Sequence, residues 1–260
     1  MDLCFQGWAW LHKGYASDRL AVAHGYFEQA VALDPVSVFG LIGVAAVDTA
    51  VALNFLPEDR AARLASAEAA LTKALSLSQE NAAAHLMLGV VQMHTRRVPE
   101  GVRQCERALE LDRNLAAAHA QIGNGKILLG RAEETEAHVQ EALGLSPRDT
   151  RAYLWCLFAG LAKFHLGKEG EAVAWLRRSV ELNRSFPSSH FLLAAALARL
   201  GQIPEARSEA QAGLAIVPIF TVARFRTDPL MDYPAGVAGR TRIIDGLRKA
   251  GVPEGERKTN

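Results

Sequence analysis

Apolar and polar residues alternate along this chain with the spacing of amphipathic helices, and the helical pattern itself repeats every 34 residues. The repeat is clearest in two consecutive segments, 81–114 and 115–148, where the run Ala-Ala-Ala-His recurs. Small residues keep the same step in both segments: Gly89 and Gly123, and Ala108 and Ala142. A period of this size, carried by small residues on helical spacing, is typical of stacked helix–turn–helix pairs. The pattern therefore predicts an all-α array.

The same pattern extends in both directions from this centre. The step from Ala30 to Ala74 is 44 residues, so we expect longer helices in that pair. A step of 37 residues, from Ala142 to Ser179, indicates a short insertion. One small residue in each second helix defines about six helix pairs: Ala30, Ala74, Ala108, Ala142, Ser179 and Gly213.

Small residues seven positions apart mark several of the first helices. We expect the first member of each pair to lie where the second helix approaches closely, because glycine has no Cβ. We expect the second member at the end of the helix, where a left-handed backbone favours glycine. The pairs are Gly7 with Gly14, Gly123 with Gly130, Gly160 with Gly167, and the variant Ala194 with Gly201.

These residues resemble the tetratricopeptide repeat over residues 1–218, including the closing pattern Ala-Leu-x-Leu-x-Pro. The resemblance implies a right-handed α-solenoid of about six helix pairs. The aromatic residue that the family carries early in the first helix is replaced by His85, His119 and His190. These histidines lie one per repeat, without a carboxylate or cysteine recurring beside them, so we expect them to pack against a neighbouring helix rather than to bind metal.

The pattern changes after Pro218, and residues 219–260 are expected to form a linker, a capping helix and a flexible tail. Four apolar residues there share roughly one helical face, as a cap on the array requires: Val237, Ile243, Ile244 and Leu247. The ending Gly-Leu-Arg-Lys-Ala-Gly-Val-Pro-Glu resembles the tail of bacterial proteins that join a class III nucleotide cyclase or a winged-helix domain to C-terminal tetratricopeptide repeats.

Charge and cysteine content narrow the function classes. The net charge is +1 at pH 7, which gives no overall field for nucleic acid or an anionic membrane. The apolar stretch 38–56 is long enough to span a bilayer, but Asp48 lies near its middle, so we expect a repeat helix there. The three cysteines form no metal-binding or disulfide pattern, which favours a reducing compartment, the bacterial cytoplasm.

No stretch of the sequence indicates catalysis, a metal or a cofactor. The segment 123–130 is a poor phosphate loop, because Ala120 stands at its first glycine and Ile127 at its hydroxyl residue. Acidic runs such as 133–136 are most simply a solvated helix face. We therefore expect a protein that is not an enzyme.

What remains is the concave groove of the array, which in this architecture is lined by the first helix of each pair. We expect it to bind a protein or peptide partner, either an amphipathic helix or an extended apolar segment. A carboxylate clamp is disfavoured because only Asn124 fits its pattern. The alternative for each groove position is a contact with the next repeat. The predicted groove residues are Trp8, Val90, Met93, Asn124, Leu161 and Phe164.

Two further hypotheses stay open at this point. The chain is a regulatory C-terminal arm of a truncated or split nucleotide cyclase or transcriptional regulator, or it self-associates through an apolar N-terminal repeat around Phe5, Trp8 and Trp10.

Overall fold

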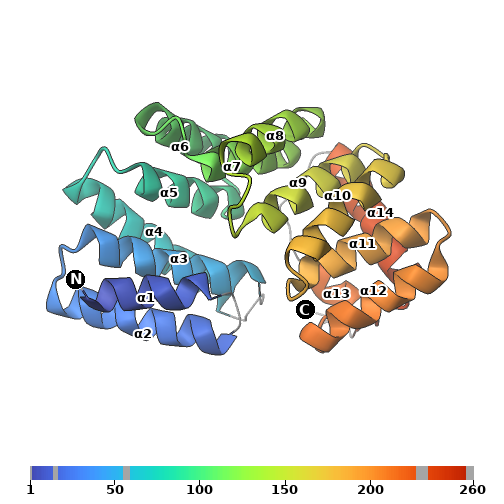
Figure 1. The fold of residues 1–260 in the computed structure, drawn as a ribbon, viewed down its shortest axis with the longest axis horizontal. Helices are drawn as coiled ribbons and strands as arrows, with labels where there is room; N and C mark the ends of the chain where they lie inside the picture. Colours follow the sequence, from blue (N-terminus) through green and yellow to red (C-terminus); the bar gives the residue numbers. More distant parts are fainter. Residues whose placement is uncertain (1, 14–16, 55–58, 227–233, 256–260) are drawn as a thin grey trace. The chain divides into compact units, whose positions relative to one another are not determined.

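The computed structural model describes residues 2–13, 17–54, 59–226 and 234–255, and every regular element within those ranges is helical. Figure 1 shows the helices in chain order. Their bounds are α1 Asp2–His12, α2 Ser17–Leu33, α3 Val38–Asn54, α4 Arg60–Leu77, α5 Ala82–His94, α6 Val98–Leu111, α7 Ala116–Leu128, α8 Thr135–Leu145, α9 Ala152–His165, α10 Glu169–Leu182, α11 Pro187–Arg199, α12 Ile203–Ile216, α13 Val222–Arg226 and α14 Pro234–Lys249, with a 3-10 turn, η1, over Ala132–Glu134.

The chain divides into two compact units, residues 1–121 and residues 122–260, and α7 contains the boundary. In unit 1 the helices pair as α1 with α2, α3 with α4, and α5 with α6. In unit 2 the pairs α9 with α10 and α11 with α12 are the best packed. These contacts confirm five of the helix pairs predicted from the repeat pattern, and the all-α fold is confirmed as well.

The longer pair expected near residue 50 is also confirmed. Helices α3 and α4 contain 17 and 18 residues, whereas α5 and α6 contain 13 and 14. Gly14, predicted to end the first helix, and the last five residues of the predicted flexible tail lie outside the described residues.

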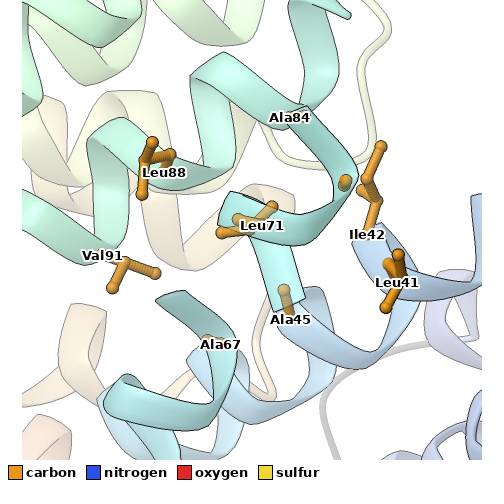
Figure 2. Close-up of a cluster of buried hydrophobic side chains, with 9 residues drawn as sticks. Leu41, Ile42, Ala45, Ala67, Leu71, Ala84, Leu88 and Val91 are labelled. Carbon is orange, nitrogen blue, oxygen red and sulfur yellow. The ribbon is translucent and has the colours of Figure 1, made fainter. Parts of the chain in front are cut away.

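The core of unit 1 is built from the small and branched residues that carry the period. Figure 2 shows these side chains gathered among three consecutive helices, each of which contributes one apolar stripe. Burial of such a stripe supplies most of the stability of a repeat helix. The cluster comprises Leu41, Ile42 and Ala45 from α3, Ala67, Leu71 and Ala74 from α4, and Ala84, Leu88 and Val91 from α5.

The glycines of the first helices lie where the sequence predicts close approach. A Cβ added at Gly89 would lie 2.6 Å from the carbonyl oxygen of Gly101 and 2.6 Å from Cys105 Sγ. At Gly160 it would lie 2.6 Å from Leu176 Cγ, whereas at Gly123 the nearest atoms, on Thr135 and His138, are 3.2 Å away. Gly89 and Gly160 are therefore held more tightly than Gly123.

The second glycine of each pair ends its helix in a left-handed conformation, as predicted. The φ angles are 79° at Gly130, 72° at Gly167 and 79° at Gly201. Arg96 occupies the position 34 residues before Gly130 and adopts the same conformation, with φ 65°. The backbone of the turn is thus kept where the glycine is replaced.

The C-terminal helix α14 lies on the first helices of unit 2, where it packs chiefly against α11 and, less extensively, against α9. Because α11 belongs to the last helix pair of the array, this contact agrees with the capping helix expected from the sequence. Ile243, Ile244 and Leu247 are buried as the apolar pattern predicts, whereas Val237 is 42% exposed. Beyond α14, the carbonyls of Pro253 and Glu254 accept hydrogen bonds from the first amides of α13.

Candidate binding surfaces

Three aromatic side chains form a patch across the first helices α1 and α3 of unit 1. This aromatic patch consists of Phe5, Trp8 and Phe39. The ring of Phe39 lies 5.8 Å from that of Phe5 and stacks at 5.5 Å on that of Trp8. Trp8 also meets the buried ring of Phe27 edge-on at 5.3 Å, which fixes it from below. Phe5 is 58% and Phe39 42% exposed, so the patch presents large apolar area to solvent.

The sequence predicts two of the three residues of this patch. Phe5 and Trp8 were identified as an apolar N-terminal surface, but Phe39 was not. Its helix belongs to the pair with the irregular 44-residue step, so the spacing rule could not place it on the same face as Trp8. Trp10, the third residue of that predicted surface, is half-buried and carries Lys13 Nζ 3.8 Å from its ring centre.

The other predicted groove residues of unit 1 are buried. Val90 is 7% exposed and Met93 is fully buried, although both lie on the first helix α5. The first helices of unit 1 pack against one another, α1 on α3 and α3 on α5. In this structure Val90 and Met93 are therefore interior residues and present little surface to a partner.

In unit 2 the predicted residues are Asn124, Leu161 and Phe164. Asn124 is 6% exposed and Phe164 is fully buried, while Leu161 is half-buried. Helix α14 covers the end of α9, where Arg242 Nη2 donates hydrogen bonds to the carbonyl oxygens of Phe164, at 3.4 Å, and His165, at 2.5 Å. Of the six predicted residues, Trp8 and Leu161 thus keep partial exposure.

A buried charge cluster explains the acidic residue in the apolar helix α3. Asp48 is 4% exposed; it accepts hydrogen bonds from Arg63 at 3.1 Å and Ser66 at 2.9 Å, and His24 Nε2 lies 3.5 Å away. Burial disfavours the carboxylate, but His24, Ser66 and Arg63 outweigh burial and lower the pKa of Asp48. The adjacent carboxylate raises the pKa of His24. Within the described residues, no helix has both the length and the apolar character to cross a bilayer.

Two of the three aligned histidines make the same bridge. His85 Nδ1 lies 2.6 Å from Gln104 Oε1 on the second helix, and its Nε2 lies 2.9 Å from the carbonyl oxygen of Gln79. His190 repeats both contacts, with Glu209 at 2.6 Å and the carbonyl of Arg184 at 2.9 Å. The histidine thus joins its own second helix to the preceding turn, which agrees with the packing role predicted. Its hydrogen bond to Glu209 raises the pKa of His190.

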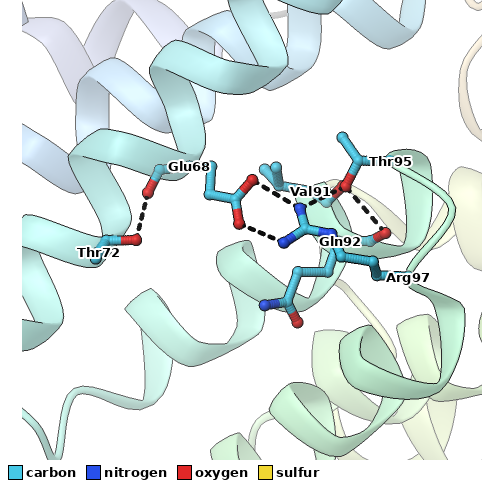
Figure 3. Close-up of polar contacts among 6 residues, drawn as sticks. All are labelled: Glu68, Thr72, Val91, Gln92, Thr95 and Arg97. Atoms are coloured by element: carbon cyan, nitrogen blue, oxygen red, sulfur yellow. Dashed lines mark hydrogen bonds and ion pairs between the residues drawn. The ribbon is translucent and has the colours of Figure 1, made fainter.

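A second polar link joins successive repeats in unit 1 (Figure 3). The guanidinium of Arg97, just before α6, donates two hydrogen bonds of 2.6 Å to the carboxylate of Glu68 on α4. Arg97 also donates to Thr95 Oγ1, whose own hydroxyl donates to the carbonyls at the end of α5. Arg97 lowers the pKa of Glu68, which keeps this fork ionised. Such a bidentate ion pair holds the start of α6 in a defined position against α4, which is a structural role.

The described residues offer little reactive chemistry. They hold no group of three or more His, Cys, Asp or Glu side chains placed to bind a metal ion. All three cysteines are free and buried. Burial raises the thiol pKa of Cys105 to about 12 and that of Cys156 to about 11, so neither is a thiolate at neutral pH.

Family comparisons identify the repeat. Models of the tetratricopeptide repeat match residues 58–116 and residues 153–186. The chain therefore contains tetratricopeptide repeats in both units. A search of curated proteins gave no significant match.

Several solved structures have the same fold at low sequence identity. Human IFIT1, solved as a dimer with m7Gppp-AAAA, has a TM-score of 0.73 at 18% identity, covering 94% of this chain and 58% of that one. The APC/C hetero-tetramer Cut9-Hcn1 has a TM-score of 0.63 at 17% identity, covering 87% of this chain and 40% of that one. Pseudomonas aeruginosa pilF has a TM-score of 0.53 at 20% identity, covering 80% of this chain and 90% of that one.

This chain thus spans 40% of the Cut9-Hcn1 chain and 58% of the IFIT1 chain that it resembles. At these identities the likeness establishes the fold, a tetratricopeptide-repeat solenoid. The predicted resemblance to the tails of cyclases and winged-helix regulators is not supported by these matches.

Proposed function

We propose that this chain is a non-catalytic protein-binding scaffold and that unit 1 takes an apolar segment of a partner protein on the aromatic patch. The observation that carries the proposal is the exposure of Phe5 and Phe39 beside Trp8 on two adjacent first helices. The tetratricopeptide repeats support it, since arrays of this kind present the surface of their first helices to protein ligands.

The chemistry of the patch suits a protein ligand. Aromatic side chains supply most of the binding energy at protein interfaces, because they bury a large area at low entropic cost. Three contacting rings form an anchor site for an apolar or aromatic side chain of the partner. A net charge of +1 gives no support to nucleic acid or a membrane as the ligand. Free buried cysteines fit a cytoplasmic protein.

The proposal is tested with peptides selected from a random phage-displayed library against the full chain. Binding of each selected peptide is then measured by fluorescence anisotropy for the wild type and for the double variant Phe5→Ala/Phe39→Ala. We expect the double variant to bind roughly 30-fold more weakly, the loss of about 2 kcal/mol typical of anchor residues. Phe5 is 58% and Phe39 42% exposed, so the melting temperature should change much less than on truncation of a fully buried ring.

Leu182→Ala is the matched control, since Leu182 is 51% exposed but lies in unit 2. Its affinity should equal that of the wild type. Equal binding by the double variant and the wild type would contradict the proposal. Sedimentation velocity of the same proteins tests the self-association hypothesis. A wild-type dimer that the double variant loses would identify the bound segment as part of a second copy.

A further inference from the structure

We propose that the first helices α9 and α11 of unit 2 form a helix-binding face, which α14 occupies as a resident ligand of the same chain. In the ligand-bound state, an amphipathic helix of a partner protein, with the residue pattern of α14, takes its place. This inference concerns unit 2 and is independent of the aromatic patch in unit 1.

The face is shaped for the backbone of a helix rather than for single side chains. On α11 the face includes Ala195, which is fully buried and whose backbone lies beside Gly246 of α14. A Cβ placed at Gly246 of α14 would overlap the backbone of Ala195, and one at Gly239 would overlap the imidazole ring of His165. Two glycines seven residues apart therefore let α14 lie close to α11 and α9 over two turns.

The residues of α14 that meet the face follow a helical stripe. Gly239, Arg242, Ile243, Gly246 and Leu247 stand at positions i, i+3, i+4, i+7 and i+8. Ile243 is 2% exposed and Leu247 is fully buried. This stripe is the pattern with which an amphipathic helix lies in a groove. The partner helix is therefore expected to carry two small residues seven positions apart, with an arginine between them. One apolar residue follows the arginine directly, and another follows the second small residue.

Polar contacts fix the orientation of α14 on the face. Arg242 supplies donors to the carbonyls of Phe164 and His165, at the end of α9, where helix carbonyls lack partners within the helix. Arg199 of α11 lies 3.3 Å from Asp245 of α14 and also pairs with Glu169 at 2.9 Å. The arginine and the acidic residue therefore set the direction of any helix bound here.

Helix α14 has a weak intrinsic helix propensity. It contains glycine at positions 236, 239 and 246, and each glycine inside a helix costs about 1 kcal/mol relative to alanine. Its opposite surface is exposed and carries Val237 together with the polar residues Thr241, Arg248 and Lys249. A weak helix held by one face exchanges more readily than a helix packed on several sides.

The experiment uses the full chain and a fluorescein-labelled synthetic peptide of residues 234–254. Gly246→Leu places a side chain against the backbone of Ala195 and should displace α14. We expect this variant to bind the peptide roughly 30-fold more tightly than the wild type, in which α14 blocks the face. Trypsin should also cleave within α14 faster. Thr241→Leu, on the exposed side of the same helix, is the matched control and should behave as the wild type does.

Two further reagents keep the test decisive. A peptide with leucine replacing both Gly239 and Gly246 should not bind. Should Gly246→Leu fail to fold by circular dichroism, Arg242→Ala/Asp245→Ala loosens α14 without adding bulk and should show the same two changes in smaller measure.

A folded variant with protease-accessible α14 and no peptide binding would overturn the proposal, as would a double variant that leaves cleavage and binding unchanged. Sedimentation could instead detect a wild-type dimer that exchanges α14 between copies and is lost in Gly246→Leu. That result would assign the face to a second copy of the chain and overturn the proposal that a different protein binds there.

Discussion

The first helices of unit 1 and those of unit 2 come from the same repeat pattern but carry opposite surfaces. In unit 1, α1 and α3 present the rings of Phe5, Trp8 and Phe39 to solvent. In unit 2, Ala195 of α11 lies beneath α14, with the backbones of the two helices in close contact at Gly246. We infer that the size of the residues on a repeat face sets the kind of ligand that the face can accept. Bulky rings offer an anchor for side chains, whereas alanines admit the backbone of a whole helix.

The substitution expected to have the largest effect is Phe164→Ala in unit 2. Because Phe164 is fully buried on α9, its truncation should lower the free energy of unfolding by about 3–5 kcal/mol. The aromatic patch belongs to unit 1, so the affinity of a patch ligand per folded molecule should stay unchanged. Urea denaturation alongside peptide titration measures both quantities.

Leu161→Ala, one turn earlier on α9, is the matched comparison for Phe164→Ala. Leu161 is half-buried, so its loss of stability should be smaller. If Phe164→Ala weakened peptide binding and left the melting temperature unchanged, the binding role first predicted for Phe164 would replace the interior role inferred from its burial.

The histidine bridges test what the two units share. His190 pairs with Glu209, and its raised pKa means that the charged form is stabilised by folding. This contribution is complete below the ordinary value of 6.5 and is lost as the pH rises through the higher pKa of the folded state. The stability advantage of the wild type over His190→Phe should therefore be about 1–2 kcal/mol at pH 5.5 and should shrink toward pH 9.

Urea midpoints across this pH range measure the effect. His85→Phe removes the same bridge in unit 1, where the partner Gln104 is neutral, and serves as the matched control. A difference between the wild type and His190→Phe that is constant from pH 5.5 to pH 9 would exclude an ion pair at this position.

The smallest expected effect concerns the turn that ends each first helix. Arg96 holds a left-handed backbone at φ 65°, where residues with a Cβ are strained. Arg96→Gly should therefore raise the free energy of unfolding by about 0.5–1 kcal/mol. Gly130→Ala, at the equivalent position with φ 79°, should lower it by a similar amount. Opposite signs for the two substitutions, read from thermal melts, would confirm one turn geometry in both units.

The sequence alone was sufficient for the repeat, because the constraints behind it are local. Gly89 and Gly160 must lie at the closest approach of paired helices, and Gly167 must end its helix, so the residue type itself records the backbone geometry. The longer helices α3 and α4 follow from the length of one step. These features recur at fixed spacing and are visible without knowledge of what lies nearby.

The candidate surfaces depend on contacts between distant residues, which spacing does not encode. Met93 and Phe164 lie on the first helices as predicted, yet both are buried. In unit 2 the covering element is α14, whose Arg242 reaches the end of α9 across 77 residues of sequence. The apolar stripe of α14 predicted a buried face but could not show that this face would extend from α11 to α9.

Because α14 is covalently tethered to the surface that it covers, it competes with any partner helix at a fixed effective concentration. A segment tethered to its own binding site is present there at an effective concentration on the order of millimolar, whatever the amount of protein in the cell. If α14 held the open face with a dissociation constant of about 10 µM, the tether would weaken the apparent affinity of every competing helix roughly 100-fold. A partner would then engage unit 2 through high local abundance, or by binding a second surface and becoming tethered itself.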